Sequence, residues 1–284
     1  MLEITLNTKP LRFLHIPKTA GTTFLSILRR QYFGKKIFAF SGDIASDIKR
    51  FEALSEHDKT NVKLFTGHAP IVSGVKRADN ATIITFLRDP INRVKSFCQH
   101  VAEGKSLYLI DEFPPETFSL DNFLKSGNEE LSNFQTKMLV CDGSYTLPDN
   151  MSDREAADLA LDNLLNKISY FGLQEYFDES LNVFSSALHW RMPIYASKNK
   201  KNINKSIQFE KRHLEKIAAL NAIDLAVYKS AKEHFVRLLN SVAFDEAKLK
   251  WFQFMTKLCR PVIQIEELIF ELTKRCTGRI FRFP

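Results

Sequence analysis

The chain has 284 residues, of which 44% are hydrophobic and 26% charged, and this balance is typical of a folded globular protein rather than a disordered or fibrous one. Lysine and arginine outnumber the acidic residues, so the net charge is +7 and the pI about 9.1, which favours anionic partners such as nucleotides and acidic glycans. The sequence has no apolar run of about 18 residues, no paired metal-ligand cysteines and no aromatic RNA-binding segment. A nucleic-acid partner is therefore not expected.

The four cysteines are far apart and lack C-x-x-C spacing: Cys98, Cys141, Cys259 and Cys276. This spacing argues against a zinc site and favours reduced, mostly buried thiols, as in a cytoplasmic protein. The N-terminal segment MLEITLNTKP has no basic region followed by an apolar core, so no signal peptide is predicted. We expect a cytoplasmic protein, and peripheral membrane contact through its C-terminal helices stays open.

The first predicted unit is a strand, a tight loop and a helix N-terminus. Residues 11–16 are apolar enough for a short buried strand, Pro17 ends it, and helical spacing runs over residues 24–33. A loop of this kind presents backbone N–H groups at the positive end of a helix dipole, which suits a phosphate group. Lys18 adds a full positive charge at the same place.

Three further strands are predicted in the first half of the chain, over residues 37–40, 62–65 and 81–87, with a polar helix over residues 43–56. Residues 81–87 are β-branched and continuously apolar, as expected for a central parallel strand. Asp89 and Pro90 then predict the N-cap and first residue of a helix.

The second half of the chain is predicted to be mostly helical. The capping box Ser152–Glu155 starts a helix, and residues 170–173 form a strand. Residues 104–130 are irregular and are interpreted as an inserted lid or acceptor-side region. The other predicted segments are helices over 131–141, 177–188, 209–220 and 222–240, a basic loop over 197–206, and a tail over 245–284 made of two helices broken at Pro261.

Strands alternating with helices predict an α/β fold with three layers, similar to P-loop proteins, with a central, mostly parallel sheet and a helical C-terminal part. We expect one catalytic domain over residues 1–244 and a helical extension over 245–284 packed on it. Ligands of such sheets bind outside the carboxyl ends of the strands. Lys18, His68 and Arg88 all follow candidate strands, so we expect them to meet at one edge.

The stretch HIPKTAGTTF departs from the phosphate loop of NTPases, G-x-x-x-x-G-K-[ST], because no lysine stands before Thr22. It resembles the 5′-phosphosulfate loop of sulfotransferases, and is especially similar to the membrane-type carbohydrate sulfotransferases. That group includes the heparan sulfate 2-O-sulfotransferases and bacterial relatives, and a bacterial member is implied. The resemblance implies that the loop binds the 5′-phosphosulfate through Lys18, Thr19, Ala20, Gly21, Thr22 and Thr23. The alternative interpretation, without this resemblance, is an ordinary strand–turn–helix corner with an exposed lysine.

A second motif, TFLRDPINRVKSFCQH, resembles the 3′-phosphate segment of sulfotransferases, in which an arginine ends a strand and a serine follows eight residues later. Here these residues are Arg88 and Ser96, and together they would bind a phosphate by charge-assisted hydrogen bonds. The plainer interpretation makes Arg88 a salt-bridge partner and Asp89 only an N-cap.

A third motif, FTGHAP, resembles the Y-H-G-H segment of the uronyl and heparan sulfate 2-O-sulfotransferases. Its second histidine matches His68, whereas the first is replaced by Thr66, so an arrangement of two histidines is in doubt. A histidine of near-neutral pKa suits a general base that takes a proton from a sugar hydroxyl. A lone histidine at a strand end is otherwise more often structural.

Weaker signals lie outside these motifs. Asn133 and Gln135 resemble a family segment, N-x-Q-T-[RK], that contacts acceptor or cofactor, and Glu175 resembles a position that holds a loop or the helix after it. A structural role is favoured for His100. The basic loop is expected either to fold over the nucleotide, with Lys205 and Ser206 as contacts, or to be a solvated surface loop.

The resemblance covers about residues 10–240. It implies a transferase of polysaccharide biosynthesis, a sulfotransferase that moves a sulfuryl group from 3′-phosphoadenosine-5′-phosphosulfate (PAPS) to a hydroxyl of a carbohydrate acceptor. Lys18 would neutralise charge on the leaving phosphate, His68 would deprotonate the acceptor, and no metal is required. Two alternatives stay open: a P-loop kinase or NTPase, and a non-catalytic protein that binds nucleotide or glycan on the same fold. The oligomeric state is not indicated.

Overall fold

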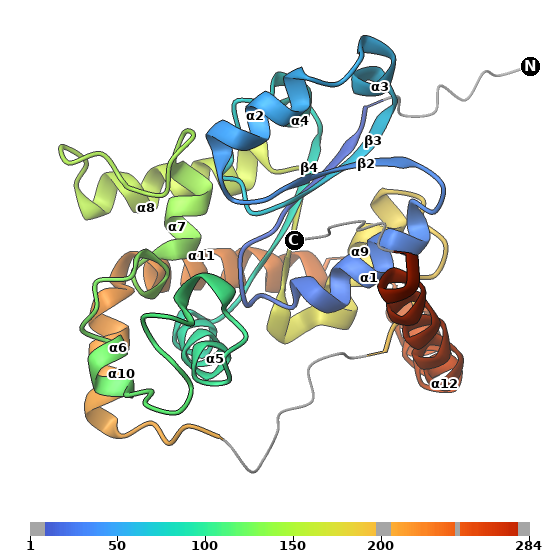
Figure 1. Ribbon diagram of the computed structural model, residues 1–284. Helices are drawn as coiled ribbons and strands as arrows, with labels where there is room; N and C mark the ends of the chain where they lie inside the picture. The colour runs from blue at the N-terminus through green and yellow to red at the C-terminus, as the bar shows by residue number, and fades with distance from the viewer. Residues whose placement is uncertain (1–8, 197–205, 242–244, 278–284) are drawn as a thin grey trace, which may run out of the picture.

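A five-stranded parallel sheet lies at the centre of the molecule, in the order β2-β3-β1-β4-β5 (Figure 1). The computed structural model describes residues 9–196, 206–241 and 245–277. The strands are β1 (Leu11–Leu14), β2 (Lys36–Phe40), β3 (Val62–Gly67), β4 (Thr82–Leu87) and β5 (Tyr170–Leu173). Among them the predicted parallel sheet is confirmed.

Helices connect the strands and cover both faces of the sheet. The longer ones are α1 (Gly21–Gln31), α2 (Ile44–Glu52), α3 (Glu56–Asn61), α5 (Pro90–Ala102), α7 (Phe134–Val140), α8 (Asp153–Asp162), α9 (Phe177–Ala187), α10 (Lys211–Leu220), α11 (Ala222–Leu239) and α12 (Glu246–Thr277). Single turns lie at α4 (Lys76–Asp79), α6 (Leu120–Phe123), Leu107–Leu109, Glu129–Leu131 and Gln174–Tyr176, and a π-turn at Asn163–Lys167.

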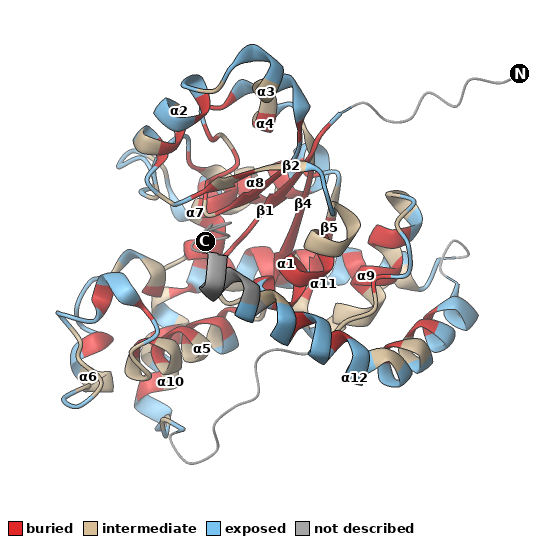
Figure 2. Cartoon of the chain, turned by 45° about the vertical axis from the view of Figure 1, so that its right-hand side comes forward, coloured by how far each residue is buried: buried red, intermediate tan, exposed pale blue. Residues whose placement is uncertain are grey.

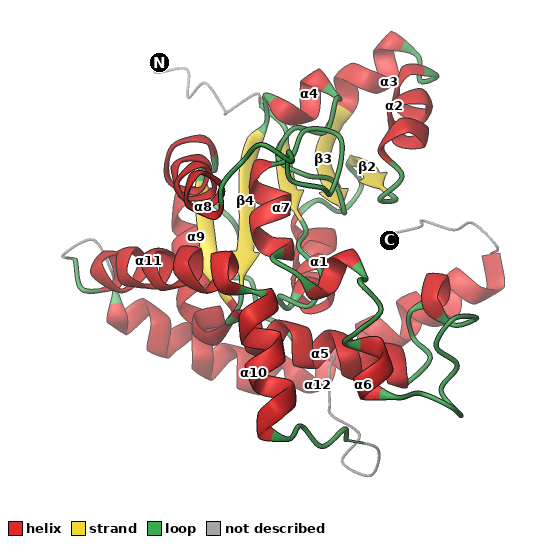
Figure 3. Cartoon of the chain, turned by 90° about the vertical axis from the view of Figure 1, so that its left-hand side faces the viewer, coloured by secondary structure: helices red, strands yellow, loops and turns green. Residues whose placement is uncertain are grey.

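Two apolar clusters separate the layers. On one face, Leu14 and Leu87 of the sheet pack with residues of α7, α8 and α11. On the other, Phe13 and Phe86 pack with residues of α1, α9 and α12. Figures 2 and 3 show the buried strands between these two groups of helices. Successive residues of a strand point to opposite faces, so the apolar runs in β1 and β4 supply both clusters.

The local signals in the sequence explain where several helices begin. Asp89 caps α5 by accepting a hydrogen bond from the backbone N–H of Asn92 at 2.9 Å, and Pro90 is its first residue. The capping box of Ser152 and Glu155 starts α8 as predicted. These ends satisfy N–H groups that a helix leaves without partners.

Two predicted boundaries are wrong. The helix expected over residues 43–56 is two helices, because Ser55 caps a new one by accepting from the N–H of Asp58 at 3.1 Å. The tail is one continuous helix, α12, with Pro261 inside it. A proline inside a helix removes one backbone donor, and where packing holds both sides in place the helix continues through it. The buried side chains Phe252 and Ile263, on either side of Pro261, hold both halves of α12 on the domain. No helix in the described ranges is long and apolar enough to cross a bilayer.

Candidate functional site

The carboxyl ends of the strands bring the sequence motifs together. β1 pairs with β3 and with β4, and Leu14 lies level with Gly67 on one side and Thr85 on the other. The loop with Lys18 follows β1, His68 follows β3, and Arg88 follows β4. Two hydrogen bonds link these loops, from the Arg88 guanidinium to the Lys18 carbonyl at 3.0 Å and from His68 Nδ1 to the His15 carbonyl at 3.0 Å. The predicted meeting of three motifs at one edge is confirmed.

The loop between β1 and α1 is a tight backbone turn. Lys18 and Ala20 both have a left-handed backbone conformation, with φ of 70° and 71°. Residues other than glycine rarely adopt this conformation outside constrained sites. The buried Thr19 hydroxyl donates to the Ile16 carbonyl at 2.8 Å. No side chain caps α1 and no acidic residue stands in its first turn. The N–H groups of Gly21 to Thr23 therefore lie at a helix end that favours an anion.

The Lys18 ammonium is partly buried and lies among charges of both signs. Burial lowers its pKa to about 8, with the Glu130 carboxylate opposing this shift and the Arg88 guanidinium adding to it. Because burial outweighs the nearby carboxylates, the protein does not fully compensate the charge of this lysine. The side chain is consequently suited to pair with an anion brought by a ligand.

His68 is fixed in one orientation by the main chain. A carbonyl oxygen only accepts hydrogen bonds, so Nδ1 of His68 donates to the His15 carbonyl and Nε2 carries the lone pair of the neutral ring. Burial holds the pKa of His68 below its ordinary value of 6.5, against the opposing effect of Glu130. The ring is therefore neutral at pH 7 and has the form of a general base.

The second histidine of the site is His15, which the sequence analysis did not single out. Its ring centroid lies 4.4 Å from that of His68 and 5.1 Å from that of Phe13. The ring is buried, its Nδ1 has no hydrogen-bond partner, and its pKa is well below 6.5 because of burial, His68 and Lys18. Thr66, at the position of the expected first histidine, is instead buried within β3. The two histidines thus follow two neighbouring strands, β1 and β3, and do not come from one motif.

Arg88 lines a cavity that runs along one side of α5. The cavity has a volume of about 390 Å³, and its lining includes Arg88, Ser96, Gln99 and Ser206. The Nε atom of Arg88 is buried and has no hydrogen-bond partner. Three residues predicted to bind the donor therefore line one cavity, and a guanidinium with spare donors faces it. The predicted contact Lys205 lies outside the described residues.

Gln135 holds the backbone of Arg88 from both sides. Its Oε1 accepts from the Arg88 N–H at 2.9 Å and its Nε2 donates to the Arg88 carbonyl at 2.9 Å. The buried carboxylate of Asp224 in α11 accepts from the N–H groups of Gln135 and Thr136, at 3.1 and 2.7 Å. Asn133, in turn, accepts from two N–H groups at the start of α11. In the structure Gln135 and Asn133 thus hydrogen-bond to the protein itself.

Glu175 holds the start of α5 in a similar way. Its carboxylate accepts from the Asp89 N–H at 3.0 Å and from the Tyr228 hydroxyl at 2.7 Å. The predicted role of holding a neighbouring segment fits these two bonds. The turn that presents Arg88 is consequently fixed on both sides, by Gln135 and by Glu175.

Two further residues lie near the site. One is Glu130, from the region after α5, which the motifs did not identify; the other is His100, on α5 itself, for which a structural role was expected. Glu130 affects the pKa of both Lys18 and His68, its Oε1 accepts from the Tyr108 hydroxyl at 2.5 Å, and its Oε2 is buried without a partner. His100 is half-buried, and burial together with Lys18 lowers its pKa to about 4. Residues 104–130 thus supply a carboxylate whose charge acts on both Lys18 and His68.

Arg12 is a buried residue whose side chain contacts the segment that follows His68. Its guanidinium donates to the Ile71 carbonyl at 2.8 Å, to the Pro70 carbonyl, and to Asp79 at 2.6 Å. Arg12 is 1% exposed, and burial lowers its pKa to about 10 despite the Asp79 carboxylate. It thereby fixes the segment that immediately follows His68. An arginine inside an apolar strand was the sequence signal for such a role.

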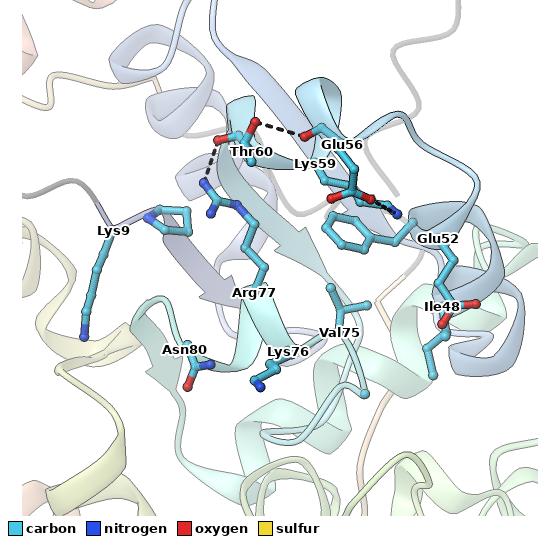
Figure 4. A pocket seen from close by; sticks show the side chains of 13 residues that line it. Lys9, Ile48, Glu52, Glu56, Lys59, Thr60, Val75, Lys76, Arg77 and Asn80 are labelled. Atoms are coloured by element: carbon cyan, nitrogen blue, oxygen red, sulfur yellow. Dashed lines mark hydrogen bonds and ion pairs between the residues drawn. The ribbon is translucent and has the colours of Figure 1, made fainter.

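A larger cavity, of about 700 Å³, lies at the opposite edge of the sheet (Figure 4). Its lining includes Lys9, Thr60 and Asn80, which precede β1, β3 and β4. The Arg77 guanidinium there donates to the Thr60 carbonyl at 2.7 Å. None of the predicted donor-binding residues lines this cavity, so we place the candidate site at the carboxyl edge.

Comparisons with known proteins point to one group of enzymes. No protein-family model matches the chain. It is 25% identical over 182 residues to heparan-sulfate 6-O-sulfotransferase 2 of Gallus gallus, covering 56% of this chain and 45% of the relative. It is 24% identical over 268 residues to the Mus musculus enzyme of that name, covering 79% of this chain and 44% of the relative. The chain thus spans less than half the length of these curated relatives.

A solved structure of mouse sulfotransferase SULT7A1 complexed with PAP matches with a TM-score of 0.39 and 15% identity, over 77% of this chain and 66% of that one. A likeness this distant carries no argument. The matched sequence relatives are 6-O-sulfotransferases, so the narrower resemblance to 2-O enzymes is not supported by them. This chain is therefore similar in sequence to heparan-sulfate sulfotransferases. Its own motif residues lie together at one edge of a parallel sheet.

Proposed function

We propose that the chain is a PAPS-dependent sulfotransferase that sulfates a hydroxyl of a carbohydrate acceptor. The observation that carries this proposal is the linked arrangement of an anion-binding loop, a second anion-binding arginine and a neutral histidine, at Lys18, Arg88 and His68. The sequence relatives, named heparan-sulfate sulfotransferases, support the carbohydrate acceptor.

The residues of the site fit the two charged ends of PAPS. The N–H groups at the start of α1, together with Lys18, suit a phosphosulfate. Arg88, with an unpaired buried Nε, and Ser96 face the same cavity and suit the 3′-phosphate. PAPS supplies a sulfuryl group bonded to a good leaving phosphate. No metal ligand set is needed to hold these groups, because nitrogen donors of the protein face both ends.

His68 would act on the acceptor. Its Nε2 takes the proton of the attacking hydroxyl as the new sulfur–oxygen bond forms and the bond from sulfur to the phosphate oxygen breaks. The electron pair of the broken bond stays on the phosphate, beside the Lys18 ammonium. The Glu130 carboxylate favours the charged form of His68 and so would stabilise the imidazolium that results.

Ligand binding tests the donor. We expect PAP to raise the melting temperature, because a ligand at a hundredfold excess over its dissociation constant stabilises the folded state by about 2.7 kcal/mol. Adenosine 5′-phosphosulfate, which lacks the 3′-phosphate, should raise the melting temperature less. Arg88→Ala should remove the advantage of PAP. Arg154→Ala, at a side chain that is 92% exposed on α8, is the matched control and should keep it. A shift with Mg–ATP and none with PAP would move the chain to the kinase class.

Turnover tests the reaction. Labelled PAPS and a desulfated heparan polysaccharide should give labelled polysaccharide with the native chain and none with His68→Ala, although His68→Ala should still bind PAP. PAP binding by both proteins with no transfer by either, on this and other glycans, would instead make the chain a non-catalytic nucleotide-binding protein.

A further inference from the structure

The helix α12 is apolar on two opposite sides. Its inner side packs on the domain through Phe252 and Ile263, which are 3% and 2% exposed, and through Glu267, which pairs with Arg29 and Arg30 of α1. Its outer side carries eight large apolar side chains, each at least 50% exposed: Trp251, Phe254, Leu258, Val262, Ile265, Leu268, Ile269 and Leu272. We call this set the outer stripe. Figure 2 shows many exposed residues along the part of α12 that is coloured by burial.

The outer stripe is continuous and large. Its members recur at three- and four-residue steps, so they form one band on the helix, and Trp251 and Leu272 lie roughly 32 Å apart along the axis. Aromatic side chains bury roughly 150–250 Å² each and aliphatic ones less, so the half-exposed stripe offers roughly 800 Å². Monomeric proteins rarely leave an apolar patch of that size without a function. It also matches the area that each partner buries in a stable interface, about 800 Å².

We propose that the outer stripe is the interface of a homodimer, in which α12 packs antiparallel against α12 of a second copy. Six of the eight members are placed symmetrically about the bond between Pro261 and Val262. A twofold axis there pairs Trp251 with Leu272, Phe254 with Ile269, and Leu258 with Ile265. A face that is complementary to itself gives a closed twofold dimer.

The distribution of side-chain size selects the antiparallel orientation. The aromatic members Trp251 and Phe254 lie in the first half of the stripe, and Ile265, Ile269 and Leu272 lie in the second half. The antiparallel pair sets each ring against an aliphatic side chain, so the distance between the two helices stays even and the contact packs closely. The parallel pair would set ring against ring at one end and separate the helices there.

The charges beside the stripe favour a second copy over an anionic membrane. One flank of the helix carries Lys250 and Lys257, and the other carries Glu266 and, about five turns before it, Lys248, all exposed. A helix that binds an anionic bilayer has basic residues along its polar margins. Beside the middle of the stripe the second flank presents Glu266, which would lie against lipid phosphates, whereas a protein partner requires no basic margin.

The oligomeric state of the full chain tests this proposal. We expect a dimer by light scattering or sedimentation, and a monomer for Leu258→Glu with Ile265→Glu, which leaves the inner side of α12 untouched. Phe33→Glu is the matched control, because Phe33 is an exposed apolar residue outside the stripe, 86% exposed, and it should remain a dimer. A native chain that is monomeric at every concentration, or that binds phosphatidylserine vesicles as a monomer, would overturn the proposal.

Cross-linking tests the orientation. In a background with Cys259→Ser and Cys276→Ser, Val262→Cys places one thiol of each copy beside the twofold axis and should form a disulfide-linked dimer under mild oxidation. Trp251→Cys places the two thiols roughly 30 Å apart in the antiparallel pair and should remain uncoupled. Equal coupling of both variants would overturn the antiparallel arrangement.

Discussion

Gly21 lies directly against the imidazole of His15: a Cβ on Gly21 would stand 1.8 Å from Nε2 of that ring. The same ring lies against His68 on another side, with 4.4 Å between the centroids. One buried imidazole therefore lies between the loop that follows β1 and His68. The absence of a side chain at Gly21 permits that contact.

Gly21→Ala should damage the donor site and the base together. The ring of His15 has to move, and overpacking of this kind costs roughly 1–3 kcal/mol of folding free energy. We expect weaker PAP binding, a lower transfer rate and a lower melting temperature. Arg154→Ala, at a side chain that is 92% exposed on α8, is the control and should leave all three properties unchanged. Unchanged PAP binding in Gly21→Ala would show that the loop does not depend on the position of His15.

Replacing the two histidines should have different effects. His68→Gln removes the proton acceptor, and loss of a general base typically lowers a rate by roughly 10²–10⁴-fold. His15→Phe keeps a ring against His68 and Phe13 and keeps the main-chain carbonyl, so it should lower kcat much less. Steady-state kinetics on the purified variants, with PAP affinity measured alongside, checks this order. A loss in His15→Phe as large as that in His68→Gln would make His15 a proton-transfer residue.

The pH dependence of kcat/KM should be bell-shaped. His68 must be neutral and its pKa lies below 6.5, so the rate should rise with pH through a value below 6.5. Lys18 must be charged and its pKa is about 8, so the rate should fall as the pH rises through about 8. Lys18→Arg, which stays charged, should remove the falling limb while lowering the maximum. A falling limb still near pH 8 in Lys18→Arg would belong to another group.

Gln135 should act on donor binding through Arg88. Removing a charge-assisted hydrogen bond costs roughly 1.5–3 kcal/mol, so Arg88→Ala should weaken PAP binding by roughly 10–100-fold. Gln135→Leu releases the backbone of Arg88 and should weaken binding less. Because the two residues act on one contact, the double variant should bind little worse than Arg88→Ala alone, as titration calorimetry would report. Additive losses would mean that Gln135 acts elsewhere.

Arg12→Leu should destabilise the fold. It leaves Asp79 without its ion-pair partner and removes the donor to three carbonyls just after His68, those of Ala69, Pro70 and Ile71. Breaking a buried pair by removing one member typically costs roughly 3–5 kcal/mol, which urea unfolding would measure. Arg154→Leu, at an exposed arginine, should change the stability by less than about 0.5 kcal/mol. Equal stabilities for both variants would contradict a supporting role for Arg12.

The sequence could predict those parts of the site that depend only on residues close together in the chain. The loop around Lys18, the cap at Asp89 and the apolar run of β4 each show their structure within a few neighbouring residues. Their meeting at one edge follows from parallel strand direction alone. The prediction that the motifs meet at one edge therefore required the order of strands and helices along the chain, but not which strands are neighbours in the sheet.

The parts that could not be predicted depend on distant pairings. His15 and His68 are 53 positions apart and meet only because β1 lies beside β3 in one register. Gln135 reaches Arg88 across 47 positions. The continuity of α12 through Pro261 depends on packing against the domain, which local propensity does not record.

The oxygen that sets the tautomer of His68 belongs to the main chain of residue 15. Any amino acid at position 15 would still offer a carbonyl there, so no substitution can delete that acceptor, and only a shift of β1 against β3 can withdraw it. The tautomer of His68 is thus set by the pairing of strands and not by any side chain. Substitutions could change the packing around His68 while Nε2 remained the nitrogen with the free lone pair.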